Sequence, residues 1–205
     1  GSGKSTWLRC ANLLETCQAG DIVFGGEPLR WHGEAGERRP ADNAQVRALR
    51  QRIAMVFQQF NLIPSLTVAS NIAFHARLAG MYDADWIALL IDRFGLASQV
   101  VKYPEQLSGG QLQRVAIART LAARPRLVLA DEPTGNLDPA TAETVLSLLL
   151  KLNQELGISF VVVTHDSHVA SQMESILSLE NGTLIDVTTP IKSMSAAAIV
   201  DANSV

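Results

Sequence analysis

Residues 126–166 read RLVLADEPTGNLDPATAETVLSLLLKLNQELGISFVVVTHD, and this stretch decides the fold. Residues 127–130 and 158–163 are continuous apolar runs, which are typical of parallel strands buried on both faces. Between them Asp138 can cap a helix with proline at its first position, and apolar residues then recur at helical spacing until a glycine ends the pattern. Strand, helix and strand in this order predict a βαβ unit, and so an α/β fold with a mostly parallel sheet.

Two acids, Asp131 and Glu132, directly follow the first of these strands. The carboxyl edge of the sheet is where α/β folds place their ligands. There Asp131 is expected to hold Mg²⁺, and Glu132 to orient and deprotonate an attacking water. For the two acids alone, a solvated strand end is the favoured explanation, so the interpretation depends on a second motif.

That second motif opens the chain: Gly1, Ser2, Gly3, Lys4, Ser5 and Thr6 match the latter half of the phosphate-binding loop pattern GxxxxGK[ST]. Glycines let backbone amides close around phosphate oxygens, and a helix over residues 4–14 adds its positive N-terminal dipole. Lys4 can reach the β- and γ-phosphates, and the Ser5 hydroxyl can bind Mg²⁺. A flexible Gly/Ser terminus also explains these six residues alone. Together with the two acids they favour an NTP hydrolase.

A third motif, LSGGQ at residues 107–111, precedes a helical pattern that runs to about residue 123. Ser108 is a natural N-cap, and Gly109 and Gly110 offer unobstructed amides to an anion. With Gln111 they form a second anion-binding helix start. Because the chain already has a phosphate loop, this one is expected to make a second phosphate contact.

Elsewhere the sequence predicts short strands at residues 22–24 and 53–57, with a polar surface excursion over 27–43 between them. Asn181-Gly182 is a hairpin turn signal between two apolar runs. We divide the chain at four boundaries. Residues 1–66 and 124–187 form the two parts of a RecA-like P-loop NTPase core, 67–123 an inserted helical subdomain, and 188–205 a loose C-terminal tail.

The composition is that of an ordinary globular protein. Of the 205 residues, 47% are hydrophobic and 18% charged, and the net charge is −3, so nucleic acid is not expected as a partner. Two cysteines exclude a disulfide framework, and no apolar run approaches the roughly 20 residues that span a bilayer.

These motifs, in this order, resemble those of the ATP-binding cassette (ABC) ATPases, over nearly the whole chain to about residue 187. GSGKST is similar to the end of Walker A, LSGGQ to the signature and RLVLADEP to Walker B, which puts Glu132 at the catalytic carboxylate position. MVFQ is similar to the Q-loop, with Gln58 sensing Mg²⁺ and the attacking water. NLD matches the D-loop with Asp138, and VTHD the switch-histidine loop with His165.

The resemblance implies a mechanism and its partners. Two cassettes pack head to tail, and each ATP, with Mg²⁺, lies between the Walker loops of one chain and residues 108–111 of the other. His165 contacts the γ-phosphate, and Asp138 couples the two sites. An integral membrane permease is implied as a further partner, so the chain is expected at the cytoplasmic face of the inner membrane as a peripheral subunit.

Subfamily features conflict. The early part resembles polar amino-acid uptake ATPases, and the later part resembles the branch of lipoprotein release, macrolide export and cell division. A cell-division or mechanotransmission ATPase that moves no cargo is therefore the alternative to a transporter subunit.

The position of Gly1 inside the phosphate-loop motif carries one more expectation. A strand normally leads into such a loop. We expect that strand to be missing, which would leave a gap among the inner strands, with unpaired backbone groups beside residues 127–130 and 158–163.

Overall fold

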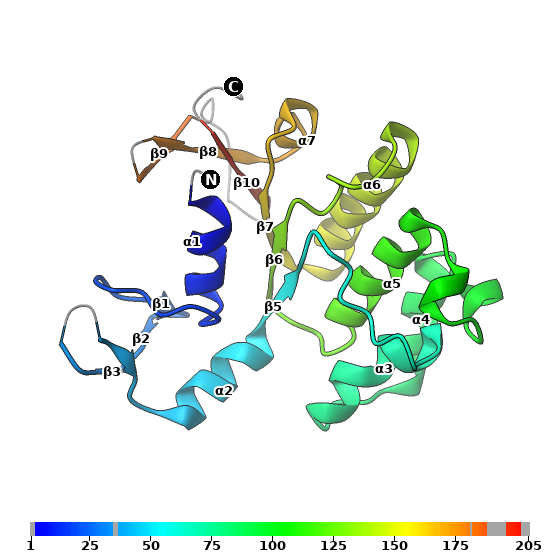
Figure 1. Cartoon of the computed structure of the whole chain (residues 1–205), viewed down its shortest axis with the longest axis horizontal. Helices are drawn as coiled ribbons and strands as arrows, with labels where there is room; N and C mark the ends of the chain where they lie inside the picture. The colour runs from blue at the N-terminus through cyan, green and yellow to red at the C-terminus, as the bar shows by residue number, and fades with distance from the viewer. Residues whose placement is uncertain (1–2, 35–36, 181, 188–195, 202–205) are drawn as a thin grey trace.

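The computed structural model describes residues 3–34, 37–180, 182–187 and 196–201 (Figure 1). Its centre is a six-stranded sheet in the order β5-β6-β7-β10-β8-β9. The strands are β5 (Ile53–Val56), β6 (Leu127–Asp131), β7 (Ser159–Val163), β8 (Ser175–Glu180), β9 (Thr183–Asp186) and β10 (Ala196–Asp201). All neighbours pair in parallel except β8 and β9. This confirms the predicted α/β fold with a mostly parallel sheet.

One face of the sheet is covered by α1 (Lys4–Ala11) and α2 (Asn43–Arg52). Leu8 of α1 and Leu49 of α2 pack with Leu129 and Val163 of the strands in one buried cluster. Two small hairpins, β1 (Val23–Phe24) with β2 (Glu27–Pro28) and β3 (Trp31–His32) with β4 (Arg39–Pro40), lie in the segment expected to be a surface excursion.

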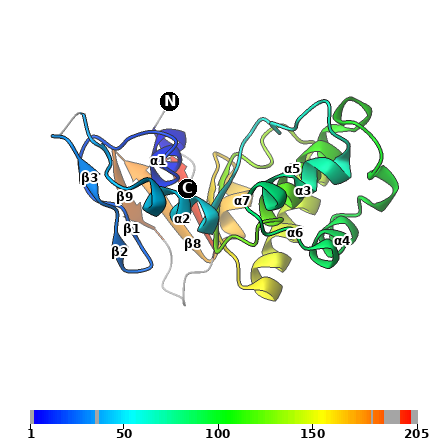
Figure 2. The same cartoon turned by 90° about the horizontal axis from the view of Figure 1, so that it is seen from below.

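The opposite face is covered by α6 (Pro139–Leu156) and by the helical part of the chain (Figure 2). That part comprises α3 (Val68–Leu78), α4 (Ala84–Arg93), the short 3₁₀ helices Ala97–Gln99 and Pro104–Gln106, and α5 (Gly109–Leu121). Residues 67–123 are all described and contain no strand, as the sequence predicts. The four-part division itself stays a prediction.

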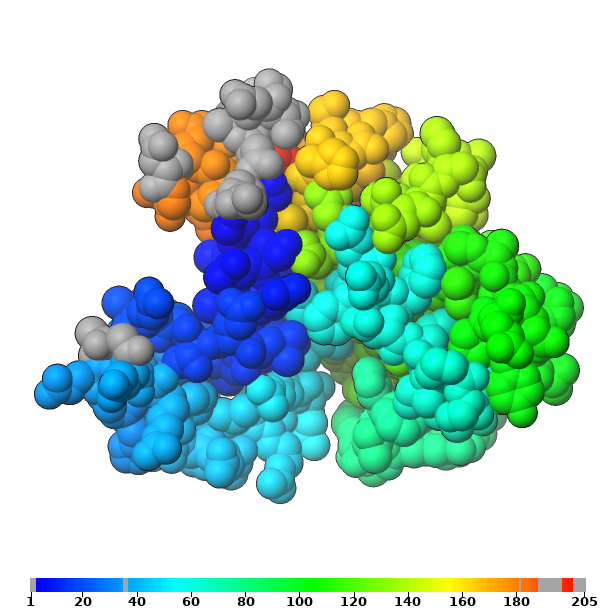
Figure 3. Space-filling view, viewed as in Figure 1, coloured from blue at the N-terminus to red at the C-terminus, as the bar shows by residue number. Residues whose placement is uncertain are grey.

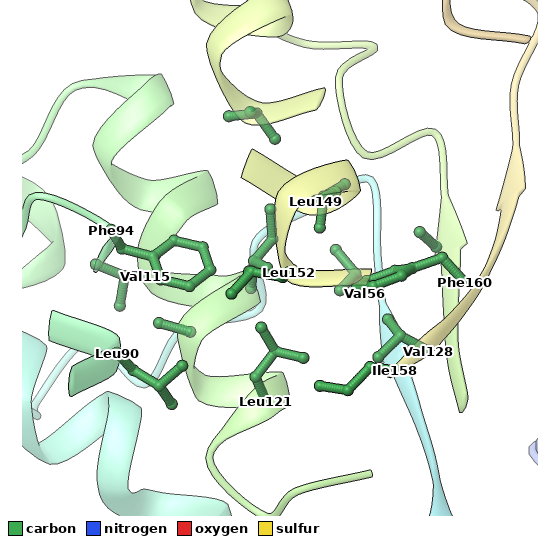
Figure 4. Close-up of a cluster of buried hydrophobic side chains, with 14 of the residues drawn as sticks. Val56, Leu90, Phe94, Val115, Leu121, Val128, Leu149, Leu152, Ile158 and Phe160 are labelled. Atoms are coloured by element: carbon green, nitrogen blue, oxygen red, sulfur yellow. The ribbon is translucent and has the colours of Figure 1, made fainter. Parts of the chain in front are cut away.

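A continuous apolar core joins these helices to the sheet (Figure 4). Phe94 and Leu121 from the helical part meet Leu149 of α6 and Phe160 of β7 in this cluster. Because strand side chains alternate between faces, Val128 of β6 points into this cluster while its neighbour Leu129 points into the other. The apolar run of β6 is thus explained by burial on both faces.

The βαβ unit forms as its sequence predicts. Oδ1 of Asp138 accepts a hydrogen bond from the backbone N–H of Thr141 at 3.1 Å, which caps α6. Gly157 ends the helix in the left-handed region at φ 64°. Leu127 of β6 then pairs with Ser159 of β7 in parallel register.

The helix after the phosphate loop is shorter than expected. It ends at Ala11 rather than near Leu14, because Leu13 adopts a left-handed backbone with φ 57°. The hairpin between β8 and β9 is present, although Asn181 of its turn lies outside the described residues, as do Gly1 and Ser2 of the phosphate loop.

The C-terminal tail requires a correction. Residues 188–195 and 202–205 lie outside the described part, but Ala196–Asp201 forms β10, an inner strand between β7 and β8. The expectation of a loose tail is therefore wrong for these six residues. The expected gap among the inner strands is wrong for the same reason, because β10 pairs with both neighbours.

Within the described residues, none of the helices has both the length and the apolar character needed to cross a membrane.

Candidate nucleotide-binding and hydrolysis site

The start of α1 lies at the carboxyl edge of the sheet. Gly3 caps the helix with φ 91°, a backbone conformation that side-chain-bearing residues rarely adopt. Oγ of Ser5 donates a hydrogen bond to Oδ1 of Asp131 at 2.9 Å, across 126 positions of sequence. The structure thus brings the phosphate-loop motif and the strand-end acids together. Lys4 is buried beside them.

The pair of Ser5 and Asp131 suits Mg²⁺. Both offer oxygen, the donor that this ion prefers, and Mg²⁺ is commonly held by one or two protein oxygens together with substrate phosphates. The donor set therefore fits an ion that arrives with a nucleotide.

Glu132 occupies a strained position. Its φ is 47°, in the left-handed region, while its N–H donates to the carbonyl of Val163 at 2.9 Å. For a residue with a side chain, such strain persists only where the surrounding structure enforces it, and it is frequent in active sites. Here the strained backbone directs the carboxylate toward the loop that follows β7.

On that loop, Nδ1 of His165 lies 2.7 Å from Oε1 of Glu132. The pKa of His165 is raised above its ordinary value, first by this hydrogen bond and second by the negative charge of Glu132, while burial and the charge of Lys4 oppose the shift. The two residues proposed as catalytic therefore contact each other directly.

The sequence reasoning missed Thr164. Its buried hydroxyl donates to Oε2 of Glu132 at 3.4 Å and accepts from the N–H of Asp166 at 3.0 Å. A threonine between a strand and a histidine is a weak signal in the sequence, so only the fold reveals the contact.

The sequence gives no signal for a second histidine–carboxylate pair, formed by His168 and Glu143. Nε2 of His168 lies 2.8 Å from Oε2 of Glu143, which connects α7 (Ser167–Ser171) to α6. Both pairs line one pocket of about 420 Å³, which Gly135 and Leu137 also line. Glu132 and His165 therefore border a space that a ligand can enter.

The signature motif forms a capping box. Oγ of Ser108 accepts from the N–H of Gln111 at 3.4 Å, and Oε1 of Gln111 accepts from the N–H of Ser108 at 3.0 Å. The N-cap prediction is thus confirmed. Ser108 and Gly109 are exposed. The motif belongs to the helical face of the sheet and α1 to the other face, so the structure does not bring these two phosphate-binding motifs together within one chain (Figure 1).

The body of α5 connects the other motifs. Nε2 of Gln113 donates to the carbonyl of Pro133, next to Glu132, at 2.5 Å. The guanidinium of Arg119 donates to the carbonyls of Phe60 and Asn61, just after Gln58, at 3.2 and 2.8 Å. A single helix therefore contacts both the loop of Glu132 and the loop of Gln58.

Gln58 and the D-loop also meet. Nδ2 of Asn136 donates to the carbonyl of Gln58 at 3.1 Å. Asp138 is exposed, and its pKa is lowered, chiefly by the side-chain hydrogen bond to Thr141 and then by backbone hydrogen bonds. Asp138 is thus an exposed, charged group at the start of α6.

Comparison with known proteins agrees with this geometry. The ABC transporter family profile matches residues 1–135. The chain belongs to the ABC transporter family, as its motifs predicted. The methionine import ATP-binding protein MetN of Caulobacter vibrioides is 43% identical over 190 residues, covering 91% of this chain and 54% of that protein. MetN of Corynebacterium jeikeium is 43% identical, with 91% and 49% covered. The chain thus spans about half the length of these relatives.

Two solved structures share the fold. The ATP-binding cassette MJ0796, in a dimeric post-hydrolysis state bound to ADP and Pi, has a TM-score of 0.74 and 35% identity, with 92% of this chain and 82% of that one covered. CbiO1 of Clostridium perfringens, part of the ABC transporter complex CbiONQ, has a TM-score of 0.76 and 28% identity, with 90% and 71% covered.

Proposed function

We propose that this chain is the ATP-binding and ATP-hydrolysing subunit of an ABC transporter and works as a dimer. The observation that carries the proposal is the meeting of Ser5, Asp131, Glu132 and His165 at one sheet edge, from three separated stretches of sequence. The family and the two structural relatives support it.

In this proposal each residue has one task. Backbone amides of the loop that holds Gly1, Ser2 and Gly3 bind phosphate oxygens, aided by the dipole of α1. Lys4 and Thr6 belong to the same loop and helix start, and Lys4 neutralises the β- and γ-phosphates. When bound, Mg²⁺ would be held by Ser5 and Asp131 and would offset the charge of the phosphates. Gln58 would sense the bound ion.

Glu132 is the general base. Its carboxylate accepts the proton of a water that attacks the γ-phosphate, and His165 orients the carboxylate through the 2.7 Å contact. The charge of a protonated His165 also faces the γ-phosphate in this arrangement. The strained backbone of Glu132 directs its carboxylate toward His165.

The dimer follows from the position of the signature motif. Ser108, Gly109, Gly110 and Gln111 begin an exposed helix start on the other side of the sheet from the phosphate loop, so they can reach a nucleotide only on a second copy. Asp138, exposed at the start of α6, is placed to contact that copy.

A permease is the proposed membrane partner. A groove of about 750 Å³ lies between α2, β5 and α3, and its walls include Val46, Met55, Phe57, Leu78 and His75. Phe57 precedes Gln58, so a segment seated in the groove would act directly on the loop of Gln58. This site supports peripheral attachment at the cytoplasmic side of a membrane.

An import system is the form of transport that we propose. The MetN relatives are named for methionine import, which favours a transporter subunit over a cell-division ATPase that moves no cargo. Their names support an amino acid as the cargo class. The cargo itself would be bound by other subunits.

The composite site can be tested by mixing two inactive variants. Lys4→Ala removes the phosphate contact in one chain, and Ser108→Arg blocks the signature of the other. Neither variant alone should hydrolyse ATP, whereas their mixture should regain activity, since one mixed dimer keeps one intact site. Mixing Lys4→Ala with Lys4→Ala/Ser108→Arg is the control and leaves no site intact. A mixture as inactive as its components, with both variants folded and dimeric, contradicts the proposal.

A further inference from the structure

Arg119 is a buried cation in the last turn of α5, the helix that begins with the signature motif. Its side chain is only 7% exposed, and burial lowers the pKa of its guanidinium. Among the described residues no carboxylate forms an ion pair with it, and its Nε has no hydrogen-bond partner. Burying a charge without a carboxylate is costly, although the negative end of the helix dipole offsets part of that cost. The burial of Arg119 therefore needs further compensating contacts.

Those contacts are two consecutive backbone carbonyls. Nη2 of Arg119 donates to the carbonyl of Phe60 at 3.2 Å, and Nη1 donates to that of Asn61 at 2.8 Å. Asn61 has a left-handed backbone with φ 48°, a conformation that asparagine adopts more often than most residues. The two arms of the guanidinium thus hold the backbone at a left-handed residue three positions after Gln58.

Gln58 itself lies against the loop of the proposed general base. Nε2 of Gln58 is 3.6 Å from the place that a Cβ on Gly135 would occupy. The N–H of Gly135 donates to the carbonyl of Glu132 at 3.1 Å, so both belong to one turn. A second contact to the same loop comes from Asn136, whose Nδ2 donates to the carbonyl of Gln58. The amide of Gln58 is therefore beside the Glu132 loop.

We infer that Arg119 is a positioning residue for Gln58: by holding the backbone at residues 60 and 61 it keeps the Gln58 amide beside the loop of Glu132. Because α5 begins with the signature motif, the helix that would reach a partner's nucleotide also sets the place of Gln58. The inference rests on the proposed function, in which Gln58 senses Mg²⁺.

Arg119→Met tests the inference, because it keeps an unbranched side chain and removes the donors. In the nucleotide-free chain, NMR order parameters of the amides of residues 58–62 should fall from the rigid range of about 0.85 to below about 0.6. Turnover should fall about tenfold, and the Mg²⁺ concentration for half-maximal turnover should rise about tenfold. Loss of a group that orients a metal site from outside costs about 10–100-fold in metal affinity or activity. Nucleotide binding without Mg²⁺ should stay unchanged.

Asn153→Leu is the matched control. Asn153 is also buried, and its Nδ2 donates to the carbonyl of Ile158 at 2.9 Å. Ile158 precedes β7 and Gln58 follows β5, and β5, β6 and β7 run in parallel, so the two residues lie at opposite edges of the sheet. Asn153→Leu should lower the melting temperature but leave the order parameters at residues 58–62 and the Mg²⁺ dependence unchanged.

Unchanged order parameters at residues 58–62 in folded Arg119→Met would overturn the inference, and so would an equal change in Asn153→Leu. Loosening of the loop with an unaltered Mg²⁺ requirement would also overturn it, since Arg119 would then serve stability alone. Should Arg119→Met fail to fold, Arg119→Lys keeps the charge but not the two-armed donor, and it is judged by the same readouts. The order parameters are measured without nucleotide, so they decide the role of Arg119 in the loop even if the unaltered chain hydrolyses no ATP. That last result would count against the proposed function alone.

Discussion

Nε2 of Gln113 lies 2.5 Å from the carbonyl oxygen of Pro133, and both groups are buried. Gln113 belongs to α5, the helix that begins with the signature motif, and Pro133 follows Glu132. One hydrogen bond therefore connects the helix that would reach a partner's nucleotide to the backbone beside the proposed general base. The bond holds the residue directly after Glu132, whose own backbone has the left-handed φ of 47°.

We expect Gln113→Met to lower turnover more than nucleotide affinity. Methionine has a similar volume but cannot donate, so the Pro133 carbonyl loses its partner at a cost of about 1–3 kcal/mol. Steady-state ATPase assays and nucleotide titrations measure the two effects. Gln154→Met, at an exposed position of α6, is the matched control. Unchanged turnover in a folded Gln113→Met variant would show that the bond has no role in hydrolysis.

A second prediction concerns Gly110. A Cβ at this position would overlap Cγ2 of Thr141 on α6. Gly110→Ala should therefore destabilise the chain by about 1–3 kcal/mol, as overpacked sites do. Adding Thr141→Ser removes the clashing methyl group and should restore the melting temperature.

The double variant Gly110→Ala/Thr141→Ser separates the role of Gly110 in packing from its role in phosphate binding. If Gly110 must leave room for a partner's nucleotide, ATPase activity stays low although stability returns. Full activity in the double variant would mean that the glycine serves only the packing of α5 on α6. The single variant Thr141→Ser should be as active as the unaltered chain.

The pair of His168 and Glu143 gives a pH prediction. The pKa of His168 is raised, first by the side-chain hydrogen bond to Glu143 and then by its charge. Because the pKa of His168 is raised in the folded chain, the pair's contribution to the free energy of unfolding is complete below the ordinary histidine pKa of 6.5. This contribution is lost as the pH rises through the raised pKa. Glu143→Gln should lower the His168 pKa in an NMR titration and leave that of His165 in place. An unmoved His168 resonance would contradict the contact.

Much of the fold could be predicted because buried strands have a recognisable apolar pattern in the sequence. The run at 127–130 is apolar throughout and the run at 158–163 is apolar except for Ser159, so both indicate strands covered on both faces. The sequence of β10 has no such pattern. Three of its six residues are alanine, which has little preference for strands, and its conformation depends on pairing with β7 and β8.

The site shows the same division. The strand-end acids and the phosphate loop could be found because their spacing in the sequence follows from local strand and helix geometry. The contacts from Gln113 to Pro133, from Thr164 to Glu132 and from His168 to Glu143 could not, because each joins elements separated by 20 or more positions. Such contacts depend on how the elements pack against one another in space, and no local pattern in a single sequence indicates that packing.

The central claim is that Glu132 is the general base of ATP hydrolysis in a two-chain site. Its most direct test is Glu132→Gln, which keeps the shape and hydrogen bonding of the side chain but cannot accept the proton. With MgATP, turnover should fall by about 10²–10⁴-fold, the usual contribution of a general base, while ATP still binds. Sedimentation should then show a stable dimer that the unaltered chain forms only transiently. Turnover within a few-fold of the unaltered chain, with ATP bound, would contradict the claim.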